Sequence, residues 1–116
     1  MSNINKVIVL GRLGKDPEHK DLGGGNSLCK FSVATTESWK DKQGNKQEET
    51  EWHNITAFGK LAEICSKYLK KGSLVYVEGK NKTSTYEKNG ETRYSTEVRI
   101  SEMKMIGDKP KSEDPF

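Results

Sequence analysis

Aromatic side chains in strongly polar surroundings are the residues of this sequence that most clearly offer chemistry. Trp39 and Trp52 stand at the two ends of a charged stretch, and Tyr86 lies among lysines and a glutamate. Exposed rings interleaved with cations suit a single-stranded nucleic acid, because its bases stack on the rings while the cations follow its phosphates. Each stacked base contributes roughly 1–3 kcal/mol, so a few such rings can bind a strand without reading its sequence.

The segment from Trp52 to Phe58 places two rings on one side of an expected strand. Successive side chains of a strand point to opposite faces, so Trp52 and Phe58, six residues apart, share a face. Asn54 and Thr56 lie between them on that same face, and the intervening small or apolar residues take the opposite face, which suits a core. Two interpretations follow: the rings are partly exposed stacking platforms, or both of them fill the core.

Motifs for catalysis and metal binding are poorly matched. The run Gly11-Arg-Leu-Gly14-Lys15 has two residues between its glycines where a phosphate-binding P-loop has four, and no Ser or Thr follows the lysine. His19 and His53 lack the neighbouring pattern of Ser or Cys with an acid that marks a nucleophile. Cys29 and Cys65 have no second Cys or His at zinc-ligand spacing, so we interpret them as buried free thiols. We therefore predict no enzyme, no metal and no cofactor.

Five strands and one helix are expected to position these residues. Alternating or continuous apolar patterns predict strands at residues 5–10, 28–36, 52–58, 74–82 and 94–105, and a loop over residues 14–26. A helix is expected between the third and fourth strands, where apolar residues follow helical spacing at Leu61, Ile64, Cys65, Tyr68 and Leu69. Its last turn should hold Lys67, Lys70 and Lys71, with Gly72 in the left-handed position after it.

Two polar arms and a tail complete the predicted organisation. Residues 41–51 indicate a long hairpin arm, and residues 83–92 indicate a second arm turned by Asn89-Gly90, a strong type I′ signal. Three strands, a helix and two strands is the element order of a five-stranded OB-fold barrel. We therefore predict an all-β domain with one helix over residues 1–106. Residues 107–116 hold prolines and charges without periodicity, which predicts a disordered, acidic-tipped tail.

Composition and charge agree with one small domain that meets an anionic partner. The chain has 116 residues, of which 31% are hydrophobic and 32% charged, with a net charge of +3. The acids are concentrated toward the end, so the remainder is more basic than the whole chain, which favours an anionic partner. No stretch approaches the roughly 18 consecutive apolar residues of a membrane span. The start of the chain lacks a signal-peptide pattern, so we expect a cytoplasmic protein.

Short motifs are spread from the first expected strand to the last. They are Asn5-Lys6-Val7, residues 11–17, Thr36-Glu37-Ser38-Trp39, Glu51-Trp52-His53, residues 58–63, residues 68–72, residues 75–79 and residues 93–97. In their order and spacing they resemble the bacterial single-stranded DNA-binding protein family over about residues 3–106. The resemblance implies an OB-fold, usually a homotetramer, that wraps single-stranded DNA during replication, repair and recombination.

The resemblance also implies roles for individual residues. The stacking rings would be Trp39, Trp52, Phe58 and Tyr86, although Trp is frequent at the last position. The family's commonly basic positions correspond to Lys60, Lys70, Lys71, Lys82 and Arg93, whereas Asn54, Ser84 and Thr85 replace residues that are often basic. The end of the chain resembles the family's acidic tip, which recruits replication and repair proteins, and comprises Glu113, Asp114, Pro115 and Phe116.

Two other classes of protein remain open from the sequence. An OB-fold module for RNA or of the primosome type would use the same barrel and basic face without the full aromatic set. An adaptor that binds proteins would retain the barrel with vestigial DNA binding. Quenching of tryptophan fluorescence by oligo-dT, oligo-rU or duplex DNA separates these classes.

Overall fold

The computed structural model describes residues 2–107, which form six strands and one helix. The tail predicted to be disordered, residues 107–116, lies outside these residues apart from Gly107. In chain order the elements are β1 (Val7–Leu13), β2 (Glu18–Gly23), β3 (Asn26–Lys40), β4 (Lys46–Phe58), α1 (Gly59–Tyr68), β5 (Leu74–Lys88) and β6 (Glu91–Met105).

Five of the strands close into a barrel. β1 pairs with β5, β5 with β6, β6 with β4, β4 with β3, and β3 returns to β1. These pairings are antiparallel except for the short parallel contact between β4 and β6. With α1 between β4 and β5, this arrangement confirms the predicted five-stranded barrel and the place of its helix. The additional strand, β2, lies outside the ring and pairs with β3.

The core fills the inside of this ring with small and β-branched side chains. Along β3 and β5 the predicted alternation holds, whereas on β4 Thr56 is buried together with Ile55 and Ala57. The most deeply buried apolar side chains include Cys29, Val33, Ile55, Ala57, Val75 and Val77. Burying a Val or Ile side chain contributes roughly 1.5–3 kcal/mol, so these positions carry much of the stability. Cys29 and Cys65 are both buried free thiols, as predicted. Burial raises the pKa of both thiols, that of Cys65 to about 12, so neither is a reactive thiolate at neutral pH.

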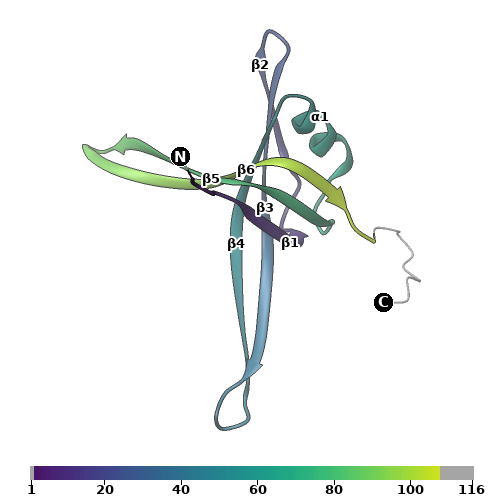
Figure 1. The fold of residues 1–116 in the computed structure, drawn as a ribbon, viewed down its shortest axis with the longest axis vertical. Helices are drawn as coiled ribbons and strands as arrows, with labels where there is room; N and C mark the ends of the chain where they lie inside the picture. Colours follow the sequence, from purple (N-terminus) through teal and green to yellow (C-terminus); the bar gives the residue numbers. More distant parts are fainter. Residues whose placement is uncertain (1, 108–116) are drawn as a thin grey trace.

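Three hairpins project from the barrel in different directions (Figure 1). The longest joins β3 to β4 through a turn in which the Asp41 carboxylate accepts backbone N–H groups from Gln43 and Asn45. Pairing continues to Lys40 and Lys46, so most of the polar stretch expected as an arm is regular strand. The hairpin of β5 and β6 turns at Asn89 and Gly90, which both have positive φ, as the predicted type I′ turn requires.

The third hairpin corrects the prediction of a loop over residues 14–26. Glu18–Gly23 form β2, and its backbone pairs with β3 from Glu18 opposite Lys30 onward. All six residues of β2 are exposed, so no side of the strand enters the core. A strand without a buried face shows no apolar alternation, and only the pairing with β3 could reveal it.

The helix differs from its prediction at its end and on its buried face. α1 ends at Tyr68, so Lys67 is in its last turn while Lys70 and Lys71 lie beyond it. Leu69 caps the helix, and Gly72, although its φ is positive, lies further along the turn that leads to β5. The buried helical residues are Ala62 and Cys65, while Ile64 and Tyr68 are exposed. Small side chains allow α1 to approach the barrel closely, which shifts its buried stripe.

The first strand also differs from the fully buried strand that its apolar run predicted. Val9 is buried, but Ile8 and Leu10 are 55% and 52% exposed because they point out of the barrel. The strand continues to Leu13, which is again buried, and therefore alternates along its whole length. No helix within residues 2–107 is long and apolar enough to cross a membrane.

Candidate nucleic-acid interface

Trp52 and Phe58 lie at the two ends of one outer surface formed by β3, β4 and β6, which we call the pocket face. Trp52 is 54% exposed and Phe58 is 44% exposed, so the interpretation that both rings fill the core is wrong. Ile55 and Ala57 are buried on the opposite side of β4, as expected from alternation. Each ring therefore has open surface on which a planar group could stack.

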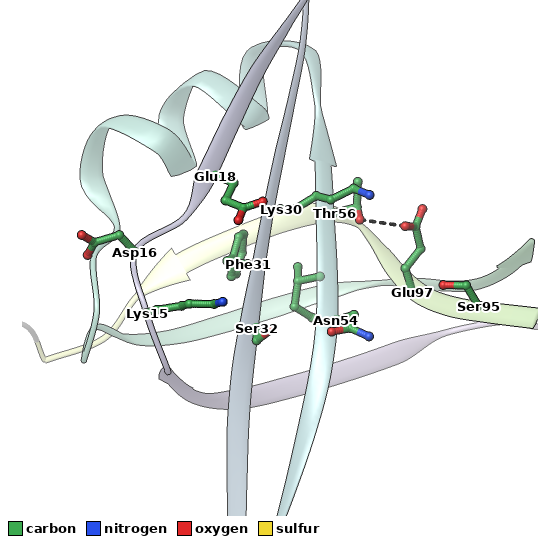
Figure 2. Close-up of a pocket in the computed structure, with 11 residues that line it drawn as sticks. Lys15, Asp16, Glu18, Lys30, Phe31, Ser32, Asn54, Thr56, Ser95 and Glu97 are labelled. Carbon is green, nitrogen blue, oxygen red and sulfur yellow. Dashed lines mark hydrogen bonds between the residues drawn. The ribbon is translucent and has the colours of Figure 1, made fainter. Parts of the chain in front are cut away.

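A polar pocket lies between the two rings. The register pairs Ser32 with Asn54 and Lys30 with Thr56, and these two pairs fall between the positions of Trp52 and Phe58. Figure 2 shows their side chains around a pocket that has Ser95 and Glu97 of β6 on one side and Lys15, Asp16 and Glu18 toward the other. Its polar and charged lining comprises Lys15, Asp16, Glu18, Lys30, Ser32, Asn54, Thr56, Ser95 and Glu97. Such a lining offers hydrogen bonds of both kinds to the edges of unpaired bases.

A chain of contacts links the floor of this pocket to Phe58. Thr56 Oγ1 donates a hydrogen bond to Glu97 Oε1 over 3.0 Å, and Arg99 Nε donates to Glu97 Oε2 over 2.9 Å. The guanidinium carbon of Arg99 lies 5.1 Å from the centroid of the Phe58 ring. Burial alone would raise the pKa of Glu97, but the hydrogen bonds from Arg99 and Thr56 outweigh it and lower that pKa. Glu97 is therefore an ionised anchor for Arg99 at neutral pH.

Trp52 is supported by a glycine instead of a side-chain network. A Cβ atom added to Gly14 would lie 2.5 Å from Cζ3 and 2.6 Å from Cη2 of the indole. The missing side chain thus allows the benzo edge of Trp52 to rest on the backbone that follows β1. A ring held from one side and open on the other is a prepared stacking surface.

We expect Gly14→Ala to weaken binding to oligo-dT by roughly 3- to 10-fold, less than the loss of a whole stacked base. The added methyl group must displace the end of the indole, which is a side chain able to move, so the fold should persist. In a Trp52→Ala background the same substitution should have no further effect on the dissociation constant. An equal loss in both backgrounds would mean that Gly14 acts independently of Trp52.

The other two predicted rings lie on separate arms. Trp39, 46% exposed, pairs with Gln47 near the end of the β3–β4 hairpin, and Tyr86, 48% exposed, pairs with Arg93 in the β5–β6 hairpin. Figure 1 shows these hairpins pointing in different directions. The structure therefore exposes all four predicted rings, but it places only Trp52 and Phe58 on one face, beyond the two ends of the β4 residues that line the pocket.

The two faces of the β3–β4 hairpin carry opposite charge. Alternation places Trp39 on the side that also holds Glu37 and Glu49, which are directly paired, and Glu51. Like charges paired across strands repel each other, so this side disfavours phosphates. Trp52 lies on the other side, where Lys30 follows beyond Ser32 toward the barrel, and where Lys40 and Lys46 outnumber one acid, Glu48, toward the tip. This difference in charge favours a path along the pocket face for a bound nucleic-acid strand.

The predicted basic residues are exposed at several places around the barrel. Lys60 follows Phe58 at the start of α1, Lys70 and Lys71 lie in the turn after α1, and Lys82 and Arg93 lie on the β5–β6 hairpin. Arg93 is paired with Glu91 at 3.4 Å. The tip residues from Glu113 to Phe116 lie outside the described residues. Among residues 2–107, no group of three or more His, Cys, Asp or Glu side chains is placed to hold a metal ion.

Gly14, Glu97 and Arg99 belong to this surface but were not predicted from the sequence. Glu97 and Arg99 carried a signal, because they occupy the outward positions of β6, in alternation with the buried residues Val98 and Ile100. Their relation to Phe58 depends on the parallel contact of β4 and β6, in which Thr56 is opposite Arg99. That contact joins distant segments and has no local signature.

Comparison with known sequences matches the chain to one protein family and to members of similar name. Residues 4–106 match the Single-strand binding protein family. The chain is 49% identical over 108 residues to single-stranded DNA-binding protein 1 of Chlorobaculum tepidum, covering 91% of this chain and 67% of that protein. It is 51% identical over 106 residues to the single-stranded DNA-binding protein of Neisseria meningitidis serogroup A, covering 90% of this chain and 61% of that protein. The chain thus spans about two thirds of the length of these relatives.

Solved structures show the same architecture. A Plasmodium falciparum SSB in complex with ssDNA superimposes with a TM-score of 0.83 at 32% identity, covering 91% of this chain and 97% of that chain. A deletion mutant of the single-stranded DNA binding protein from Thermus aquaticus gives a TM-score of 0.77 at 27% identity, covering 89% of this chain and 50% of that chain. The barrel, the exposed rings and these matches lead to one conclusion: this chain belongs to the single-strand binding protein family.

Proposed function

We propose that this chain binds single-stranded DNA without strong sequence preference and protects it during replication, repair and recombination. The observation that carries the proposal is the pair of exposed rings, Trp52 and Phe58, on either side of a polar pocket. Bases stack on the rings, and exposed lysines around the barrel follow the phosphates. The presence of ssDNA in the complex formed by the Plasmodium falciparum neighbour supports DNA as the ligand. Such a protein acts in the cytoplasm, at the nucleoid.

Titration of intrinsic tryptophan fluorescence tests this proposal, because both tryptophans are exposed rings of the proposed interface. We expect strong quenching by oligo-dT and little by duplex DNA, since paired bases cannot stack on protein rings. Equal quenching by oligo-rU would instead favour an RNA-binding module. Equal quenching by duplex DNA would contradict recognition of unpaired bases.

We infer that Trp39 and Tyr86 extend the same bound strand over the two hairpins, with Lys82 and Arg93 nearby on the second. Lys60, Lys70 and Lys71 add cations around α1, each exposed to solvent. A DNA strand that contacts the pocket face and both hairpins must bend around the barrel. This favours DNA that wraps around the protein instead of crossing it in an extended conformation.

We further propose that the chain assembles with itself, as a tetramer. On the outside of β1, Ile8 and Leu10 are exposed beside the cross-strand residues Glu78 and Tyr76 of β5. Tyr76 donates a hydrogen bond to Glu78 over 2.7 Å, and Lys6 pairs with Glu78 at 3.0 Å. An apolar centre with a polar rim is typical of a protein interface. A second copy can cover this surface through two-fold symmetry, while the number four follows the family pattern.

Removal of residues 108–116 should keep the affinity for oligo-dT and reduce capture of replication and repair proteins. We propose that the acidic tip, Glu113, Asp114, Pro115 and Phe116, is a short ligand, because its carboxylates suit a basic groove and Phe116 offers an aromatic anchor. Pull-down from a bacterial lysate, with full and shortened chains compared at equal loading, measures this. Capture of the same replication and repair proteins by the shortened chain would contradict the role of the tip.

A further inference from the structure

Arg99 is a cation held in place on the pocket face by Glu97 and the Phe58 ring. It lies on β6 opposite Thr56 of β4, within the stretch between the two stacking rings. Its Nε group is held by Glu97 over 2.9 Å, and its guanidinium carbon lies 5.1 Å from the Phe58 ring centroid. Glu97 is in turn fixed by Thr56 over 3.0 Å. Two independent contacts therefore orient this guanidinium.

The orientation leaves donors available beside the stacking ring. Within residues 2–107, the hydrogen bond that Arg99 makes to Glu97 uses Nε, so the two Nη nitrogens remain free to donate. The side chain is 38% exposed, which allows these groups to meet a ligand from solvent. A guanidinium presents its donors in a planar fork that matches two oxygens of a phosphate.

We propose that Arg99 binds the phosphate of the nucleotide whose base stacks on Phe58. The base would use the open side of the ring, while Arg99, fixed at the same ring by Glu97, would reach the backbone of that nucleotide. The proposal rests on the proposed binding of single-stranded DNA and assigns one cation to one stacking position. Arg99 also adds a fixed positive charge beside Asn54, which is neutral at the centre of the same face.

The number of phosphates that the protein neutralises can be counted from the salt dependence of binding. For single strands, the slope of log K against log salt is about −0.7 for each neutralised phosphate. Arg99→Met should therefore reduce the magnitude of this slope by about 0.7. If binding at 1 M salt is unchanged, the affinity for oligo-dT falls about eightfold at 50 mM salt and about twofold at 300 mM.

Lys67→Met provides a matched control. Lys67 lies 5.3 Å from the Tyr68 ring centroid, so its substitution removes the same charge from a similar contact on α1. We expect this variant to keep the wild-type slope. Arg99→Lys, which retains the charge, should also keep the slope while binding more weakly, because it loses the hydrogen bond to Glu97 in its present geometry. Thermal denaturation of each variant verifies that the fold is intact.

A double-mutant cycle tests the pairing with Phe58. If Arg99 and Phe58 bind one nucleotide, the loss from Arg99→Met together with Phe58→Leu should be smaller than the product of the two single losses. The corresponding cycle with Lys67→Met should be additive. An Arg99→Met variant whose slope equals that of Lys67→Met overturns the proposal, while strong quenching of the wild type by oligo-dT would still support the proposed function. A wild type that fails to bind oligo-dT overturns the function itself.

Discussion

Replacing Trp52 with Ala should weaken binding to oligo-dT by roughly 1–3 kcal/mol, about 5- to 150-fold, while leaving the barrel folded. The ring is 54% exposed and rests against the backbone of Gly14, so its removal takes little from the core. What is lost is the platform on which a base stacks at one end of the pocket. Equilibrium titration gives the affinity, and circular dichroism of the same samples monitors the fold.

Trp39→Ala is the matched comparison, because the two rings have similar exposure but different surroundings. Trp39 is 46% exposed and shares its side of the hairpin with Glu37, Glu49 and Glu51. Those carboxylates repel phosphates, so we expect a smaller loss of affinity than for Trp52→Ala. The difference should shrink at high salt, because screening weakens the repulsion. Equal losses at low salt would show that the acidic side does not direct the strand, and loss of the circular dichroism signal would mean that a ring is structural.

The barrel could be predicted from local pattern because apolar residues recur at every second position of its strands, as expected when one face of a strand is buried. Val75 and Val77 alternate with exposed or half-buried neighbours, and the turn at Asn89 and Gly90 is specified by two residues. β2 could not be predicted, because all of its side chains are exposed and its backbone pairing to β3 leaves no local pattern in the sequence. Alternation also predicted that Trp52 and Phe58 share a face, but it left open whether that face is exposed or buried.

The parts of the site that escaped prediction depend on contacts between distant segments. Gly14 matters through a ring 38 positions later, and Arg99 matters through Glu97, Thr56 and Phe58. Sequence pattern indicates which side of a strand a residue occupies, but not which neighbour lies across a barrel. Ile8 and Leu10 show a related limit of sequence pattern. An apolar run predicts that its side chains are buried, but it does not distinguish burial in the core from burial against a second chain.

Leu10→Asp should break the proposed tetramer into dimers or single chains. Leu10 is 52% exposed on the outside of β1, where a second copy would cover it. A carboxylate enclosed there without a partner costs several kcal/mol. Two-fold symmetry places the change twice in each interface, so the penalty is doubled. Nearby Glu78, already paired with Lys6, adds like-charge repulsion instead of relief.

Light scattering measures the outcome directly, because the chain mass is 13.1 kDa and each assembly is a multiple of it. Leu22→Asp is the control, since Leu22 is 51% exposed on β2, outside the barrel and away from β1. We expect the wild type and Leu22→Asp to retain the mass of four chains at micromolar concentration and Leu10→Asp to lose it. A wild type of 13.1 kDa under these conditions would refute assembly altogether. Dissociation of Leu22→Asp alone would place the interface on the β2–β3 hairpin instead of the outer face of β1.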